Sequence, residues 1–156
     1  MNEKRNGKGR RRRAGAALDS GGIEGGAHRL AMRVYWEDTD ASGIVYYANY
    51  LKFIERGRSA LLRHLGIDQP ALWRDRGLAF VVRRCAIDYH SPARLDDLIE
   101  VETRLGDLSG AAVELLQVVR RSDSKLASAV VKLACIDRNG RPQRLPPAVK
   151  TALATI

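Results

Sequence analysis

The sequence predicts an α+β fold in which a curved antiparallel sheet of five strands wraps around one long central helix. Three observations support the element order β-α-β-β-β-β: residues 30–37 alternate between apolar and polar side chains, residues 47–65 carry apolar side chains at helical spacing, and four strand-like segments follow. One helix covers five strands only if the sheet curls around it. An open sheet of this kind leaves an edge strand that can pair with a second copy, so we expect a homo-oligomer, either a dimer or a homotetramer.

The first strand is predicted over residues 30–37. Apolar side chains occupy every second position there, which is typical of a strand with one buried face. These positions are Leu30, Met32, Val34 and Trp36. A turn rich in carboxylates follows the strand, directly before the helix.

The central helix is predicted to begin at Tyr47, where the spacing of apolar residues changes to three and four. Its C-terminal stop is Gly66. Gly57 lies on the apolar face, where glycine lowers helix propensity by about 1 kcal/mol relative to alanine. We therefore expect a sheet to pack closely against Gly57. The apolar face consists of Tyr50, Ile54, Gly57, Leu61 and Leu65.

The remaining strands follow a short connector that contains Trp73 and is predicted to be partly helical. Turn-rich breaks at residues 106–110 and 122–124 separate them, and such short connections join antiparallel neighbours. The predicted strands are Phe80–Tyr89, Leu98–Leu105, Ala111–Arg120 and Leu126–Ile136.

The 156 residues are enough for one domain with its own core. We expect a basic Gly/Arg-rich tail at residues 1–27, disordered because it lacks large apolar side chains. The folded domain is expected over residues 28–140, and residues 141–156 are expected to form a C-terminal extension.

The net charge of +9 belongs mostly to the tail. Seven basic residues and one acidic residue lie within residues 1–13, so that segment alone carries +6 and the rest of the chain carries +3. The charge of the domain is ordinary, and we expect no specific nucleic-acid partner. For the tail, contact with RNA, contact with an anionic membrane surface and no specific role stay open, and we favour the last.

The two cysteines, Cys85 and Cys135, are far apart in apolar segments and are predicted to be reduced core residues. The spacing of His, Cys and Asp suggests no metal site, and no serine lies in a Gly-x-Ser-x-Gly motif. No segment reaches the apolar length of a membrane helix or of a secretory signal, so we expect a cytoplasmic protein.

The turn before the helix holds the residues with the clearest chemical potential. Asp38 and Asp40 precede Gly43, and the first helical turn has backbone N–H groups without intrahelical partners. A carboxylate beside such donors can attack a carbonyl, or activate a water that attacks it, while the donors polarise the carbonyl oxygen. The pattern Asp-x-x-Gly before a helix is also a common cap or turn, and from these residues alone that interpretation stays open.

These residues and this element order resemble the hotdog-fold acyl-CoA thioesterases, in the branch that contains 4-hydroxybenzoyl-CoA thioesterase and the YbgC-like enzymes associated with the Tol-Pal system. The resemblance covers roughly residues 29–140. It rests on Val34-Tyr-x-Glu-Asp-Thr-Asp-x-x-Gly-x-Val-Tyr46, on Tyr50-Leu-x-Phe-x-Glu-Arg56 with Arg58, and on Pro92-Ala-Arg-Leu-Asp-Asp97.

The resemblance implies hydrolysis of an acyl-CoA thioester to the free acid and coenzyme A, with no cofactor because coenzyme A is part of the substrate. It assigns Asp40 the role of nucleophile or of general base, and both roles stay open. It assigns polarisation of the carbonyl to the backbone N–H of Tyr47, aided by the helix dipole. Substrate-binding residues are expected at Gly43, Ile44, Val45 and Tyr46.

The chain departs from the YbgC-like pattern at two positions. Tyr47 stands where many YbgC-like members have His, and Trp36 stands where they have Tyr, whereas the benzoyl-type relatives also have Tyr at the former position. The alternative function is a non-catalytic module that binds acyl-CoA or an acyl-carrier protein. The sequence does not indicate the acyl group.

Other polar residues are expected to be structural. We expect Asp38 to bond loop N–H groups, Glu55 to form an ion pair with Arg58 rather than to act in catalysis, and His90 to lie in a surface loop rather than to contact ligand. Basic residues at the rim could bind the coenzyme A phosphates or simply protect strand edges. The candidates are Arg83, Arg84, Arg120, Arg121 and Lys132.

Overall fold

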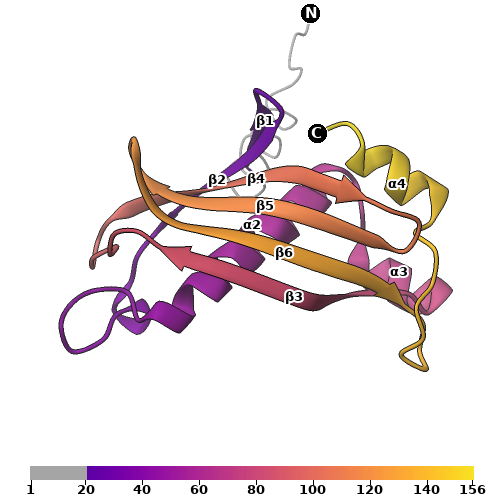
Figure 1. Cartoon of the computed structure of the whole chain (residues 1–156), viewed down its shortest axis with the longest axis horizontal. Helices are drawn as coiled ribbons and strands as arrows, with labels where there is room; N and C mark the ends of the chain where they lie inside the picture. The colour runs from indigo at the N-terminus through magenta and orange to yellow at the C-terminus, as the bar shows by residue number, and fades with distance from the viewer. Residues whose placement is uncertain (1–20) are drawn as a thin grey trace, which may run out of the picture.

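The computed structural model describes residues 21–156, and in them a six-stranded antiparallel sheet lies against helix α2, Tyr50–His64 (Figure 1). The strand order across the sheet is β1-β2-β4-β5-β6-β3. The expected α+β fold, a curved antiparallel sheet around one long central helix, is confirmed. The strands are β1 (Gly22–Glu24), β2 (Ala27–Arg33), β3 (Ala79–Tyr89), β4 (Leu98–Leu108), β5 (Ala112–Arg121) and β6 (Ser124–Ile136).

The sheet has one strand more than the five predicted. Strand β1 pairs with β2 through a two-residue turn, Gly25-Gly26, in which both glycines have the positive φ that such a turn requires. The folded part therefore begins at least as early as Gly22, inside the segment that we assigned to the tail. Residues 1–20 lie outside the described residues, and our expectation for them stays a prediction.

The first long strand also lies earlier than predicted, at Ala27–Arg33 instead of residues 30–37. Residues 36–38 form a short 3₁₀ helix, η1 (Trp36–Asp38). The buried carboxylate of Asp38 accepts a hydrogen bond from the N–H of Tyr35 at 2.9 Å, which bends the chain away from the extended form. The alternation of apolar residues continues to Val34 and Trp36, beyond the end of the strand at Arg33, and this is why the strand was predicted too late.

Three short helical elements complete the described chain. The 3₁₀ turn η2 (Tyr47–Asn49) leads directly into α2, and α3 (Gln69–Arg76) forms the partly helical connector that we expected around Trp73. Helix α4 (Pro147–Leu153) lies in the C-terminal extension, and it buries Val149 and Leu153 in the core. No helix among residues 21–156 has the length and apolar character needed to cross a membrane.

Helix α2 packs against the sheet over its apolar face, with Phe53, Ile54 and Leu61 buried. The close approach expected at Gly57 is confirmed, because a Cβ atom there would lie 2.5 Å from Cγ1 of Val101 on β4. The contact fixes the depth at which the helix lies on the sheet. It therefore also helps to fix the position of the first helical turn.

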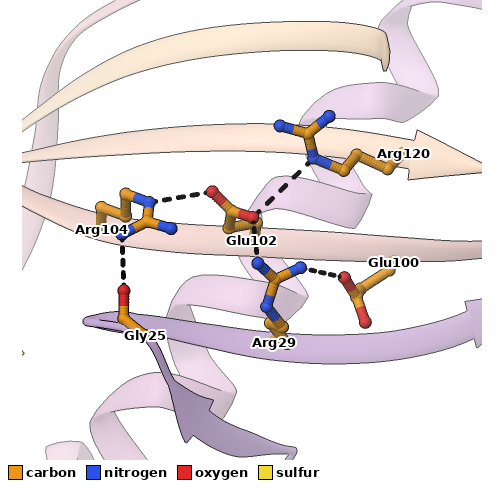
Figure 2. A network of polar contacts seen from close by, with 6 residues as sticks. All are labelled: Gly25, Arg29, Glu100, Glu102, Arg104 and Arg120. Carbon is orange, nitrogen blue, oxygen red and sulfur yellow. Dashed lines mark hydrogen bonds and ion pairs between the residues drawn. The ribbon is translucent and has the colours of Figure 1, made fainter. Parts of the chain in front are cut away.

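The face of β4 that points away from α2 carries a network of ion pairs (Figure 2). Glu102 lies at its centre, with Arg29 at 2.7 Å, Arg104 at 2.9 Å and Arg120 at 3.8 Å. Burial opposes ionisation of Glu102, but the Arg104 hydrogen bond and the charges of Arg29 and Arg104 hold its pKa below the usual range. Arg120 is therefore engaged with a carboxylate, which weakens it as a candidate for coenzyme A phosphates.

Only one of the two cysteines is a core residue. Cys135 on β6 is buried, but Cys85 on β3 is exposed. The prediction for Cys85 was wrong because β3 is an edge strand, most of whose residues are exposed. Neither cysteine forms a disulfide within the described residues.

Candidate active site

The loop between η1 and η2 forms a tight turn that presents Asp40. The carbonyl of Asp40 accepts the N–H of Gly43 at 3.0 Å, and the N–H of Asp40 donates to the carbonyl of Ile44 at 2.9 Å. Gly43 has a φ of +75°, a conformation that residues with a side chain rarely adopt. The glycine of the motif thus closes the turn.

The carboxylate of Asp40 is exposed and held by Ser42. Oδ1 accepts the backbone N–H of Ser42 at 2.8 Å and also the Ser42 hydroxyl. The hydroxyl and then the N–H of Ser42 lower the pKa of Asp40, because both favour the ionised form. The N–H of Ile44 also lowers the pKa of Asp40. Both hydrogen bonds from Ser42 go to Oδ1, so Oδ2 of the exposed carboxylate is the oxygen better placed to meet a substrate or a water.

Replacing Ser42 by alanine should raise the pKa of Asp40 toward its ordinary value, because the hydroxyl that stabilises the ionised form is lost. If Asp40 must be ionised to act, the acid limb of kcat/KM should move to higher pH, with a nearly unchanged rate at pH 7.5. Rate profiles between pH 3.5 and 8 measure this shift. A shift toward lower pH, or the same profile in both proteins, would contradict the role of Ser42.

Asp38 has the structural role that we expected. The residue is 1% exposed, and its carboxylate accepts the Tyr35 N–H. Its carbonyl accepts the N–H of Tyr46 at 3.0 Å and Nδ2 of Asn49 at 2.9 Å. The residue thereby joins η1 to the turn that begins the helical segment. Asp38 therefore fixes the two segments on either side of the Asp40 turn, η1 before it and Tyr46–Asn49 after it.

The first helical turn presents free donors. The carbonyl of Tyr46 accepts the N–H of Asn49 at 2.8 Å, whereas no acceptor among residues 21–156 takes the N–H of Tyr47 or Ala48. Because η2 continues into the 15-residue helix α2, these donors lie at the positive end of a long helical segment. They are suited to an oxygen on which negative charge develops.

A pocket of about 310 Å³ opens beside this turn. Of the residues we expected at the site, Ile44, Val45 and Tyr47 line it, whereas Gly43, Tyr46 and Asp40 do not. Asp40 lies in the same turn, joined to Ile44 by a hydrogen bond. Sequence reasoning missed the other lining residues, which are Tyr50, Tyr89, His90, Ser91 and Pro92.

His90 is an exposed loop residue after β3, as we expected, and it also forms part of the pocket wall. Its Nε2 lies 2.8 Å from Oγ of Ser128 on β6. The loop after His90 is tied to the pocket, since the N–H of Ala93 donates to the hydroxyl of Tyr50 and the carbonyl of Ala93 accepts the N–H of Val45, both at 2.9 Å. The pocket is thus built from segments that are distant in sequence.

Two larger grooves, of about 420 and 380 Å³, lie at the opposite end of α2, near α3 and α4. They share Gly66, Ile67 and Asp68 and contain none of the residues that the motifs single out. We assign the site to the smaller pocket because it adjoins the ionised carboxylate and the free N–H groups.

Glu55 and Arg121 do not line the pocket beside Tyr47. Glu55 accepts a hydrogen bond from Ser59 and does not form the ion pair that we expected with Arg58. Arg121 pairs with Asp97 at 2.6 Å. Within residues 21–156 no cluster of His, Cys, Asp and Glu could hold a metal ion.

Two of the basic candidates for phosphate binding lie together. Arg84 and Lys132 line a small cavity of about 190 Å³ with Glu114, on the neighbouring strands β3, β6 and β5. The carboxylate partly offsets their charge. They stay candidates, as does Arg83, which is exposed on β3.

The known proteins that this chain resembles include thioesterases. The model of the Thioesterase-like superfamily matches residues 34–153. The acyl-CoA thioesterase YbgC of Haemophilus influenzae is 46% identical over 122 residues, which cover 78% of this chain and 90% of that protein. The acyl-CoA thioester hydrolase YbgC of Escherichia coli O157:H7 is 41% identical over 123 residues, which cover 78% and 91%. A crystal structure of a probable thioesterase from Bartonella henselae matches with a TM-score of 0.73 and 42% identity, covering 77% of this chain and 99% of that one.

Proposed function

This chain belongs to the Thioesterase-like superfamily, and from that premise we propose that it hydrolyses an acyl-CoA thioester to the free acid and coenzyme A, with Asp40 as the catalytic carboxylate. The relatives described above confirm the resemblance to YbgC-like hotdog thioesterases. One observation carries the proposal for the site: a carboxylate of lowered pKa lies in the turn that supplies Ile44 to the pocket wall, and free N–H groups lie beside the pocket at the start of the helical segment.

The reaction needs a group that attacks the thioester carbon and a donor for the oxygen. Oδ2 of Asp40 can attack directly, so that coenzyme A leaves as a thiolate and water hydrolyses the mixed anhydride. Alternatively, Asp40 takes a proton from water, and the resulting hydroxide attacks. In both routes the N–H of Tyr47, with the free N–H of Ala48 beside it, stabilises the oxyanion of the tetrahedral intermediate. The departing thiolate takes a proton from the solvent.

The acyl group is expected to occupy the pocket beside Tyr47. The walls combine the aliphatic side chains of Ile44 and Val45 with three tyrosine rings, those of Tyr47, Tyr50 and Tyr89. Gly43 and Tyr46 contribute by shaping the loop around it, although neither lines the pocket.

Release of free thiol from short-chain, long-chain and aromatic acyl-CoAs by the purified full chain tests the proposal, and the best substrate identifies the acyl class. Turnover of at least one class above the rate without enzyme is the expected result. Tight binding of acyl-CoA or an acyl-carrier protein without thiol release would overturn it in favour of a binding module.

We further propose that the chain works as a homo-oligomer in which edge strand β3 pairs with a second copy. Strand β3 forms one edge of the described sheet and exposes Val81 and Val82. A long, exposed edge strand is a template for pairing. Sedimentation equilibrium should give a multiple of the 17.3 kDa chain mass. A monomer at micromolar concentration would contradict this.

The proposed chemistry uses only a carboxylate, backbone N–H groups and water, so we propose that no cofactor is required. Prolonged dialysis against EDTA should leave the rate of thiol release unchanged. We also propose that the enzyme is cytoplasmic, where acyl-CoA substrates are made and thiols such as the exposed Cys85 stay reduced. Fractionation of cells that contain the full chain, followed by immunodetection, tests this location.

A further inference from the structure

Tyr89 connects the end of strand β3 to the first helical turn. Its hydroxyl donates a hydrogen bond to the carbonyl of Tyr47 at 3.0 Å, and its ring meets the rings of Tyr47 and Tyr50 edge-on, with centroids 6.2 and 5.5 Å away. Burial raises the pKa of Tyr89, so the hydroxyl keeps its proton at neutral pH and stays a donor. The residue also lines the pocket.

The bond to Tyr47 has a consequence for the free N–H groups, because peptide units are planar. A carbonyl and the N–H of the next residue lie in one plane and point in opposite directions. Asn49 holds the carbonyl of Tyr46 and so orients the N–H of Tyr47. Tyr89 in turn holds the carbonyl of Tyr47 and so orients the N–H of Ala48.

The two consecutive peptide planes are therefore each held through the carbonyl, while their N–H groups stay without an acceptor among the described residues. Helix ends ordinarily fray, so without these two hydrogen bonds the peptide planes at the start of the helix could tilt away from this orientation. Donors that are already oriented stabilise a developing charge without reorganisation during the reaction.

We propose that Tyr89 is a positioning residue for the hydrolysis, whose hydroxyl fixes the Tyr47–Ala48 peptide so that the N–H of Ala48, beside that of Tyr47, points at the thioester oxygen. This role rests on the proposed function. Tyr89 acts through the backbone of Tyr47 and needs no contact with the reacting atoms. The signal is absent from the sequence, because Tyr89 reaches the site only through the fold.

The variant Tyr89→Phe removes the hydroxyl and keeps the ring, so the pocket wall and the aromatic contacts stay. We expect kcat to fall about tenfold, a fraction of the loss that follows removal of a whole oxyanion donor, with KM within about twofold. The matched control is Tyr35→Phe, which removes a hydroxyl from an exposed tyrosine outside the pocket and should leave both constants unchanged. Thermal unfolding of each variant should match the wild type.

A second readout reports on the bound carbonyl itself. In the inactive Asp40→Asn background, the infrared carbonyl band of bound 4-hydroxybenzoyl-CoA should lie below that of the free thioester, because N–H donors polarise it. Adding Tyr89→Phe should reduce this shift, an effect that a role limited to packing does not produce.

Three results would overturn the proposal: an unchanged kcat in Tyr89→Phe, a band shift that stays the same without the hydroxyl, or the absence of any band shift. If the wild type hydrolyses no acyl-CoA, the proposed function fails by itself. The band of the bound thioester, compared with and without the Tyr89 hydroxyl, then still decides whether Tyr89 orients the donors.

Discussion

Asp40→Asn is expected to lower kcat for acyl-CoA hydrolysis by about 10³-fold or more while leaving the fold intact. Asparagine has the same shape, and its amide oxygen can accept both hydrogen bonds that Ser42 gives to Oδ1. The turn closed by Gly43 should therefore persist. What disappears is the negative oxygen, which either route of hydrolysis requires. Thiol release, with thermal unfolding and circular dichroism of both proteins, measures the effect.

The matched control for this variant is Glu37→Gln, which neutralises another exposed carboxylate in the same motif. Its rate should stay within about twofold of the wild type, because Glu37 precedes the turn and lies outside the pocket. A rate near that of the wild type in Asp40→Asn would remove Asp40 from the mechanism. The helical carboxylate Glu55 would then be the next residue to replace.

Trapping separates the two roles of Asp40 that stay open. If Asp40 attacks the thioester and water then attacks the Asp40 carbonyl of the mixed anhydride, a single turnover in water enriched in ¹⁸O should place label in the carboxylate of Asp40. If Asp40 activates water, or if water attacks the acyl carbon of the anhydride, label should enter only the released acid, so label in Asp40 is the result that establishes direct attack. Mass spectrometry of the peptide that contains residues 38–46 reads this out.

The main helix and four of the strands could be predicted because their patterns are local. The apolar spacing from Tyr50 to Leu61 follows the turn of a helix, and alternation marks strands such as Leu98–Leu108. Strand β1 could not be predicted, because Gly22–Glu24 has only one apolar residue and is held by its pairing with β2. The exposure of Cys85 likewise depends on the order of strands, which no local pattern contains.

The sequence predicts only the part of the candidate site that comes from the motif around Asp40. Asp40, Ile44, Val45 and Tyr47 form one continuous motif, and the fold places three of them in the pocket wall and the fourth in the adjoining turn. Tyr89 lies far along the chain, in a segment that reads simply as a strand. Its part in the site arises because β3 ends beside the first helical turn. A motif search therefore finds the carboxylate and misses the groups that orient the donors.

Gly57→Ala should destabilise the protein by about 1–3 kcal/mol, as expected for overpacking of a dense core. Helix propensity alone predicts the opposite sign, since alanine is favoured over glycine by about 1 kcal/mol inside a helix. The new Cβ, however, would lie 2.5 Å from Cγ1 and 3.0 Å from Cβ of Val101. Valine is branched at Cβ, and Val101 is fully buried within β4, so its side chain cannot rotate away freely. Urea unfolding of both proteins measures the difference.

A double variant tests whether the contact itself causes the loss. Val101→Ala alone should destabilise by leaving a cavity, but combined with Gly57→Ala the new methyl group fills part of that space. The two changes should therefore cost clearly less together than the sum of the single variants. Additive costs would mean that the loss does not come from the contact with Val101. A Gly57→Ala variant more stable than the wild type would mean that α2 lifts from the sheet without penalty. The depth of the helix would then not be fixed at Gly57, and the placement of the N–H groups of Tyr47 and Ala48 would depend on the contacts at the start of the helix alone.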